Sequence, residues 1–349
     1  MRKLVLALFV ACVTTTIGQN IRPLKLWEEY PFVTFTTFHP SQIIKADNNW
    51  DVIMSFRKPH SVKYLDSIGV HAKPSQLILL NIEGLIKYKD GNWQTCMPIM
   101  DSLQTATIRH NSALLAQDVC AQIKDDVKGV VRYCADTGYK DNAFSLIFSY
   151  ILDNKCWDEL NIDYSGMMDG ATWQGLYYIL YNKRDFLCGT NSLPRDSAKV
   201  AVTWGNDDPD FASGVYSFIG KLCDEYVKNG KITNRDLLDE AVSFGLADTD
   251  GNITIPVIDE THSTALQDLS TSICKKIKAN LEHSKYVDDL MSIPGITDKR
   301  MAIIIFYHEL MYDMLECMVK EKLISLPRMW TSDSPAQFLF KDVVYIQKG

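Results

Sequence analysis

The sequence lacks every short motif that would assign a common catalytic or cofactor chemistry. It contains no Gly-x-Ser-x-Gly nucleophile elbow, no phosphate-binding loop, no dinucleotide fingerprint and no Cys-x-x-Cys pair at zinc-ligand spacing. His308-Glu309 has no second histidine four residues on, because position 312 is Tyr, so the helical zinc-peptidase motif is also missing. We therefore expect no cofactor and no metal centre, and no motif gives a positive reason to propose an enzyme.

Long apolar runs are missing beyond the first residues. Residues 1–18 begin with Met1-Arg2-Lys3, continue in a run of about ten apolar residues and end in small residues, the build of a secretory signal peptide. A membrane-spanning helix needs about 20 apolar residues. We expect cleavage near Gly18 and export to the periplasm, the cell surface or the medium, with lipid attachment at Cys12 as an alternative.

An excess of basic charge is missing too. The chain has 36 Lys and Arg against 43 Asp and Glu, a net charge of −7, and loss of Arg2 and Lys3 with the signal peptide leaves 34 against 43, or −9. A surface this acidic repels phosphate backbones and anionic lipids. No nucleic acid is therefore expected as a partner.

The chain does contain one stretch written twice. Residues 84–101, which begin Gly-Leu-Ile and contain Asp-Gly-Asn, are echoed by residues 245–259, which begin Gly-Leu-Ala and contain Asp-Gly-Asn again. A constant offset of 158 positions then aligns the apolar stripes of two long segments. We predict two tandem modules, 19–184 and 185–349, joined near a polar loop at residues 189–197.

Each copy of the stretch has local signals for a helix end, a hairpin and a helix start. Gly84 follows an apolar segment that begins at Pro74 and is typical of a short helix. Asp90-Gly91 between two β-prone segments indicates a tight hairpin. Asp101 with Gln104 has capping-box spacing and predicts a long helix, followed by a second one over about 143–160.

The order of short helix and β-hairpin resembles the recognition helix and wing of winged-helix domains. The predicted fold is therefore α+β and helix-rich, with two tandem repeats, each a winged-helix-like helix–hairpin unit followed by two long helices. The resemblance implies DNA binding, but no Lys or Arg lies between Pro74 and Gly84, and the second copy places Arg235 among Asp236, Asp239 and Glu240. DNA binding is accordingly only the third hypothesis.

Eight cysteines remain after residue 18, and most lie in apolar helical patterns typical of buried free thiols. An even count in an exported protein also permits disulfides, for which the sequence assigns no pairing. Cys96 and Cys188 are conceivable nucleophiles, but no base is visible beside either in the sequence.

Candidate binding residues are those found in one module only. Aromatic clusters can serve as interfaces or stack on sugars, with core packing as the alternative use. They are Trp173, Tyr177, Tyr178 and Trp330. A weak candidate for cation binding is the acidic turn with Asp207, Asp208 and Asp210, for which a solvated turn is the alternative.

The leading functional hypothesis is an exported, non-enzymatic binding or scaffold protein that recognises another protein or a surface glycan. The alternative is a hydrolase with its site in a cleft between the two modules.

Overall fold

The computed structural model describes residues 21–205, 209–332 and 340–348. The fold is mixed α and β, as predicted. The chain divides into two compact units: unit 1 comprises Met1–Ile99 and Ser165–Ile179, and unit 2 comprises Met100–Tyr164 and Leu180–Gly349. These units do not follow the module boundary drawn between residues 184 and 185, which therefore stays a prediction based on the repetition in the sequence.

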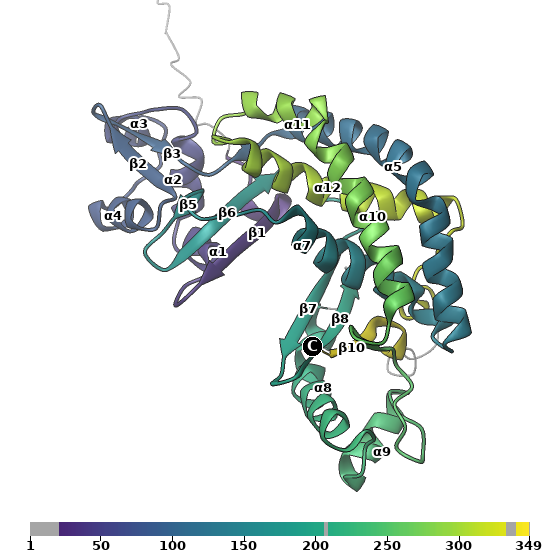
Figure 1. Ribbon diagram of the computed structural model, residues 1–349. Helices are drawn as coiled ribbons and strands as arrows, with labels where there is room; N and C mark the ends of the chain where they lie inside the picture. The colour runs from purple at the N-terminus through teal and green to yellow at the C-terminus, as the bar shows by residue number, and fades with distance from the viewer. Residues whose placement is uncertain (1–20, 206–208, 333–339, 349) are drawn as a thin grey trace, which may run out of the picture. The chain divides into compact units, whose positions relative to one another are not determined.

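Unit 1 combines short helices with two small sheets (Figure 1). Its helices are η1 (Leu24–Leu26), α1 (Pro40–Lys45), α2 (Asn49–Ser55), α3 (Val62–Ser67) and α4 (Pro74–Ile82). Its strands are β1 (Glu28–Phe35), β2 (Ile86–Lys89), β3 (Asn92–Thr95), β4 (Ile99–Met100), β5 (Met168–Asp169) and β6 (Trp173–Leu180). One sheet has the order β1-β6-β4 with β5 paired to β6, and the β2-β3 hairpin forms the other.

The predicted hairpin is confirmed. Asp90 and Gly91 have φ angles of 51° and 80°, the two left-handed residues that a tight hairpin turn requires, and Lys89 pairs with Asn92 across it. The predicted glycine stop of α4 is confirmed as well, because Gly84 lies at φ 67° and the Leu85 N–H donates to the Leu80 carbonyl at 2.9 Å.

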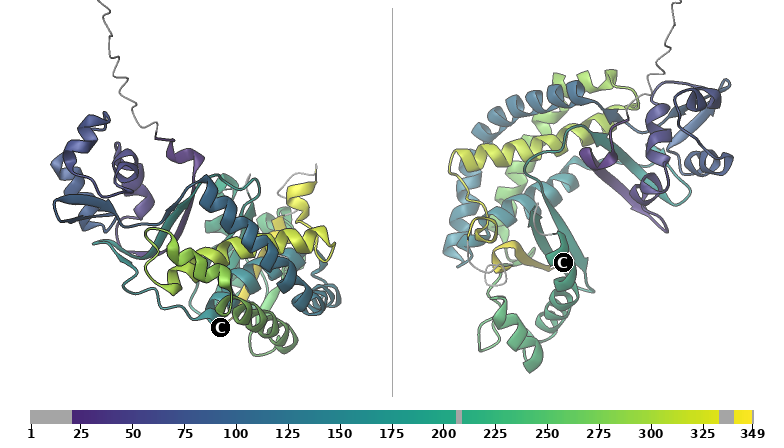
Figure 2. Two further views of the ribbon diagram at one scale, coloured as in Figure 1. Left: turned by 90° about the horizontal axis from the view of Figure 1, so that it is seen from above. Right: turned by 180° about the vertical axis from the view of Figure 1, so that it is seen from behind.

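Four helical segments form one part of unit 2. They are α5 (Ser102–Asp136), the segment formed by α6 (Ala143–Ser145), the π-helix η3 (Leu146–Lys155) and α7 (Cys156–Leu160), then α10 (Thr264–Glu282) and α12 (Lys299–Lys320). The connecting pieces are η2 (Lys140–Asn142), α11 (Lys285–Asp289) and η4 (Leu290–Ser292). Helices α5, α10 and α12 lie side by side (Figure 1 and Figure 2). The predicted cap of α5 is confirmed, because Asp101 Oδ1 accepts from the Gln104 N–H at 3.0 Å.

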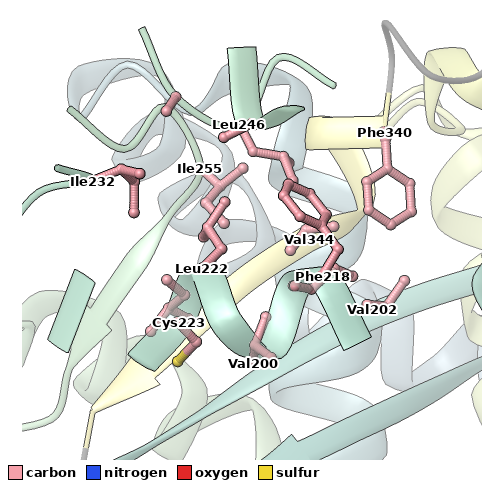
Figure 3. Close-up of a cluster of buried hydrophobic side chains, with 14 of the residues drawn as sticks. Val200, Val202, Phe218, Leu222, Cys223, Ile232, Leu246, Ile255, Phe340 and Val344 are labelled. Carbon is pink, nitrogen blue, oxygen red and sulfur yellow. The ribbon is translucent and has the colours of Figure 1, made fainter. Parts of the chain in front are cut away.

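Unit 2 also contains a sheet with its own core. The strands β7 (Cys188–Pro194), β8 (Ala198–Gly205), β9 (Val257–Asp259) and β10 (Val344–Lys348) have the order β7-β8-β10-β9. The helices beside them are α8 (Pro209–Asn229), α9 (Arg235–Ser243), α13 (Arg328–Thr331) and η5 (Phe340–Val343). Figure 3 shows side chains of β8 and β10 gathered against Phe218 and Leu222 of α8.

One element was predicted wrongly. Residues 189–197 were expected to form a loop, but β7 occupies most of this segment and pairs antiparallel with β8. The strand was missed because Thr190, Asn191 and Ser192 are polar. An edge strand tolerates such residues, since its backbone partner lies on one side only. Among the described residues, no helix combines the length and apolar character needed to span a bilayer.

Candidate functional site

Helix α4 presents an apolar face to solvent. Its inner face buries Leu77 and Leu80, whereas Ile78, Leu79 and Ile82 are 57%, 41% and 53% exposed. Scattered apolar residues are normal on a protein surface, but three on one nine-residue helix form a contiguous patch. This patch is a feature of unit 1 that its own folding does not explain.

The helix is held firmly at its start. Gln76 is buried, and its side chain accepts from the Lys73 N–H at 2.9 Å and donates to Asn48 at 2.8 Å. Pro74 at the first turn fixes the backbone in a helical conformation. The exposed face of α4 is therefore presented by a pre-organised element.

A groove runs beside α4, between the helix and the β2-β3 hairpin. Its volume is about 770 Å³, within the range of sites that hold ligands of a few side chains. Most of its lining is apolar: Val62, Ala72, Pro74, Leu77, Ile78, Tyr88 and Trp93. The Tyr88 and Trp93 rings lie 5.0 Å apart and form the wall on the hairpin side. We call this feature the α4 groove.

Among the described residues that line the α4 groove, the charged one is Lys63. Lys87 and Lys89 flank Tyr88 on β2, but side chains alternate along a strand, so these two lysines lie on the opposite face of the hairpin. No carboxylate is found among the described residues that line it. The site thus offers apolar contacts with positive charge at its edge.

Three of the four predicted aromatic residues lie on β6, and all three are buried. The Tyr178 ring stacks on Tyr30 with ring centroids 4.9 Å apart, and the Trp173 indole donates to the Glu83 carbonyl at 3.1 Å. The Tyr177 hydroxyl donates to the Glu29 carboxylate. These side chains form part of the interior of unit 1.

Glu29 is a partly buried carboxylate that remains charged. Burial by itself raises its pKa, but hydrogen bonds from Lys45, Tyr177 and Ser41 outweigh burial and hold the pKa below the usual range. The same contact with Glu29, together with burial, raises the pKa of Tyr177. This arrangement fastens β1 to α1 and β6.

The fourth predicted aromatic, Trp330, belongs to α13 in unit 2. It is half-buried, meets the Phe144 ring edge-on at 5.3 Å and covers Gly205. It packs against the core shown in Figure 3.

Of the acidic turn, Asp207 and Asp208 lie outside the described residues, and Asp210 falls in the first turn of α8. No group of three or more potential metal ligands occurs in the part of the chain that the structure describes.

Sequence reasoning missed a buried ion network in unit 2. Arg184, in the connection between β6 and β7, donates to Glu309 and Asp313 on α12 at 2.8 and 2.9 Å. Arg109 on α5 donates to the same Glu309 oxygen at 2.8 Å. Glu309 is fully buried. The only sequence signal was a charged residue within the apolar pattern of α12.

This network joins elements rather than presenting a reactive group. Burial raises the pKa of Glu309, but Arg184 and Arg109 overcome that effect and hold it below the usual range. The neighbouring His308 lies 2.8 Å from the Ile304 carbonyl, and burial lowers its pKa to about 4. His308 is therefore neutral near pH 7, as befits a core histidine.

The two conceivable nucleophiles are poorly suited to that role. Burial raises the pKa of Cys96 and raises that of Cys188 strongly, so the reactive thiolate form is disfavoured in both.

A scan against protein-family models finds no match, and no curated protein and no solved structure matches the chain. The α4 groove is therefore the candidate functional site.

Proposed function

We propose that this protein is an exported, non-enzymatic binding protein that holds an apolar segment of another protein chain in the α4 groove. One observation carries the proposal: α4 exposes Ile78, Leu79 and Ile82 on the face where a nucleic-acid reader would carry basic and amide side chains. Exposed apolar surface of this kind favours a protein partner.

The local arrangement supports a winged-helix interpretation of this region. α3 and α4 are joined by a turn that includes Gly69 at φ 78°, and the β2-β3 hairpin follows α4 directly. His60, just before α3, pairs with Trp93 through two backbone hydrogen bonds of 3.0 and 2.8 Å, which adds a third segment to the hairpin. In this interpretation α4 occupies the place of the recognition helix and β2-β3 that of the wing.

The chemistry of the groove defines the partner. Filling the space between Ile78, Tyr88 and Trp93 requires aliphatic or aromatic side chains, each of which gains about 1.5–3 kcal/mol when fully buried. Lys63 favours an acidic residue flanking those side chains and accelerates their encounter. The expected partner is a short segment with apolar anchors and acidic flanks.

Selection of peptides from a random library against the full chain tests this proposal. Enriched peptides should share apolar anchors beside Asp or Glu, and Ile78→Asp should weaken their binding at least tenfold, because it places a charge in the apolar groove. Leu103→Asp is the matched control, since Leu103 is 76% exposed on α5 in unit 2. Its binding should equal that of the wild type.

Several results would count against the proposal. They are the absence of enriched peptides, binding that Ile78→Asp leaves unchanged, and preferential binding to DNA or to immobilised glycans. Binding to glycans that depends on Tyr88 would instead support the carbohydrate hypothesis. Cleavage of peptide or glycoside substrates by the same preparation would favour the hydrolase.

We also infer that the chain is an internal duplication in which each copy contributes one sheet. The orders β1-β6-β4 and β8-β10-β9 place corresponding strands in corresponding positions. The Ile179 N–H donates to the Pro98 carbonyl at 3.1 Å, and the Ile346 N–H donates to the Pro256 carbonyl at 2.9 Å. These bonds join the last strand of each copy to the residue just before its short strand.

Contacts at the helix ends and between helices support the same inference. The Leu246 N–H donates to Ala241 at 2.8 Å, which repeats the helix stop seen at Leu85. Gln122 on α5 and Asn280 on α10 lie 158 positions apart and exchange two side-chain hydrogen bonds of 3.2 and 3.0 Å. Equivalent residues that contact each other reciprocally are typical of a two-fold relation. We therefore infer an approximate two-fold axis between α5 and α10.

A further inference from the structure

Two thiols from distant parts of the sequence meet inside unit 2. Cys156 begins α7 and Cys274 lies in the middle of α10, 118 positions later, yet their sulfur atoms are 2.7 Å apart. Both residues are buried, at 1% and 2% exposure. Helices α7 and α10 pack along each other, so the contact belongs to a regular helix interface.

We infer that Cys156 and Cys274 form a disulfide bond when the protein folds under oxidising conditions. Two unbonded sulfur atoms do not approach as closely as 2.7 Å, whereas a disulfide bond is about 2.05 Å long. The helix interface has therefore brought the sulfurs to a separation that a small side-chain adjustment converts into a bond. The inference is independent of what the α4 groove binds.

The pair borders a surface pocket. Cys274 is one of the residues lining a polar pocket of about 420 Å³, together with Lys155, Glu159 and Glu260. Lys155 and Glu260 form an ion pair at 2.5 Å across it. A small oxidant can therefore reach Cys274 from this side while α7 and α10 are docking.

The bond forms by thiol–disulfide exchange with a low-molecular-weight or protein disulfide as oxidant. The thiolate of Cys274 attacks one sulfur of that disulfide, which creates a mixed disulfide and releases one oxidant thiolate. The thiolate of Cys156 then attacks Cys274 Sγ and displaces the other oxidant thiolate. The pair loses two protons to solvent and two electrons to the oxidant, and the two released oxidant thiolates take up two protons from solvent to become thiols.

The timing of the reaction follows from burial. Burial, followed by the neighbouring Cys274, raises the pKa of Cys156 well above its usual value, so the thiolate is scarce in the folded state. Exchange is therefore fastest while the helices are docking and slow in the finished fold. Once closed, the bond should resist reduction for the same reason.

The test is refolding of the reduced full chain in a mixture of reduced and oxidised glutathione, followed by alkylation in denaturant without reductant. Digestion and mass spectrometry should show the Cys156 and Cys274 peptides joined and two hydrogens lighter than their sum. Seven of the nine cysteines should then be alkylated, and all nine after reduction. The oxidised protein should melt about 4–15 °C above the reduced protein.

Variants separate this bond from other pairings. Cys156→Ser should abolish the joined peptides and the redox dependence of the melting temperature. Cys223→Ser should retain both, because Cys223 lies in the separate core of Figure 3. Full alkylation of Cys156 and Cys274 in wild-type protein refolded in the glutathione mixture would overturn the inference, as would a disulfide formed only elsewhere, for example between Cys120 and Cys317.

Discussion

Replacing Arg184 by methionine tests whether the buried ion network holds unit 2 together. Methionine retains an unbranched apolar side chain but removes the charge and its hydrogen bonds. Glu309 would keep Arg109 as a partner at 2.8 Å, whereas Asp313, whose side chain is only 8% exposed, would lose the cation 2.9 Å away. Loss of one partner from a buried pair costs about 3–5 kcal/mol of the free energy of unfolding, because a charge is left buried and uncompensated.

The pH dependence of this loss has a definite sign. Burial raises the pKa of Asp313, and Arg184 partly opposes that rise, so the substitution should raise the pKa further. A carboxyl group whose pKa is higher in the folded than in the unfolded state binds more protons when folded. Such a carboxyl group lowers the free energy of unfolding little when the pH is below its unfolded-state pKa of about 3.9. It lowers the free energy of unfolding progressively more as the pH rises from that value through the pKa of the folded state. Arg184→Met should accordingly be more destabilising at pH 8 than at pH 5.

Urea unfolding followed by circular dichroism at both pH values measures the effect. Arg184→Met with Asp313→Asn should recover part of the loss at pH 8, because the neutral amide removes the unpaired charge. Arg195→Met is the matched control, since Arg195 pairs with a half-exposed Asp224 on the surface of the same unit, and it should cost no more than about 1 kcal/mol. A loss below about 1 kcal/mol for Arg184→Met, or an equal loss at both pH values, would refute the reasoning.

Two further substitutions probe the local structure by thermal or urea unfolding. Asp101→Ala should destabilise α5 by about 1 kcal/mol through loss of its cap, whereas Asp101→Asn should be nearly neutral, and equal effects would contradict the capping role. Gly175→Ala should cost about 2–5 kcal/mol, because Gly175 lies at φ 128° and an added Cβ would lie 2.3 Å from the Phe32 carbonyl oxygen of β1. Gly138→Ala, at φ 85° with open space around it, measures the backbone strain alone, so a comparable cost at both glycines would show that the close approach to β1 is unimportant.

The sequence was most informative where the cause of a structure is local. Asp90-Gly91 specifies its turn by left-handed backbone preference, Gly84 ends α4 for the same reason, and Asp101 caps α5 with its own side chain. Such signals lie within a few residues of one another, so a single sequence contains them completely.

The sequence was least informative about which surface is exposed. Ile78, Leu79 and Ile82 looked like part of an apolar helix with no preferred side, and only packing in unit 1 showed that Leu77 and Leu80 occupy the interior. Tyr177 and Tyr178 were candidate binding residues, but inside unit 1 they contact Glu29 and Tyr30 of the neighbouring strand β1. Burial depends on what lies opposite a side chain, and that partner comes from elsewhere in the chain.

By itself the sequence determined the local elements of this protein: the turns, the helix stops, the caps and most segment types. Only the tertiary structure decided that Arg184 reaches Glu309, that Cys156 meets Cys274, and that α4 presents an apolar face beside a groove. The physical reason is range. Backbone preferences and capping act over one helical turn, whereas ion pairs, thiol contacts and grooves arise from packing between segments more than a hundred residues apart or from several elements at once.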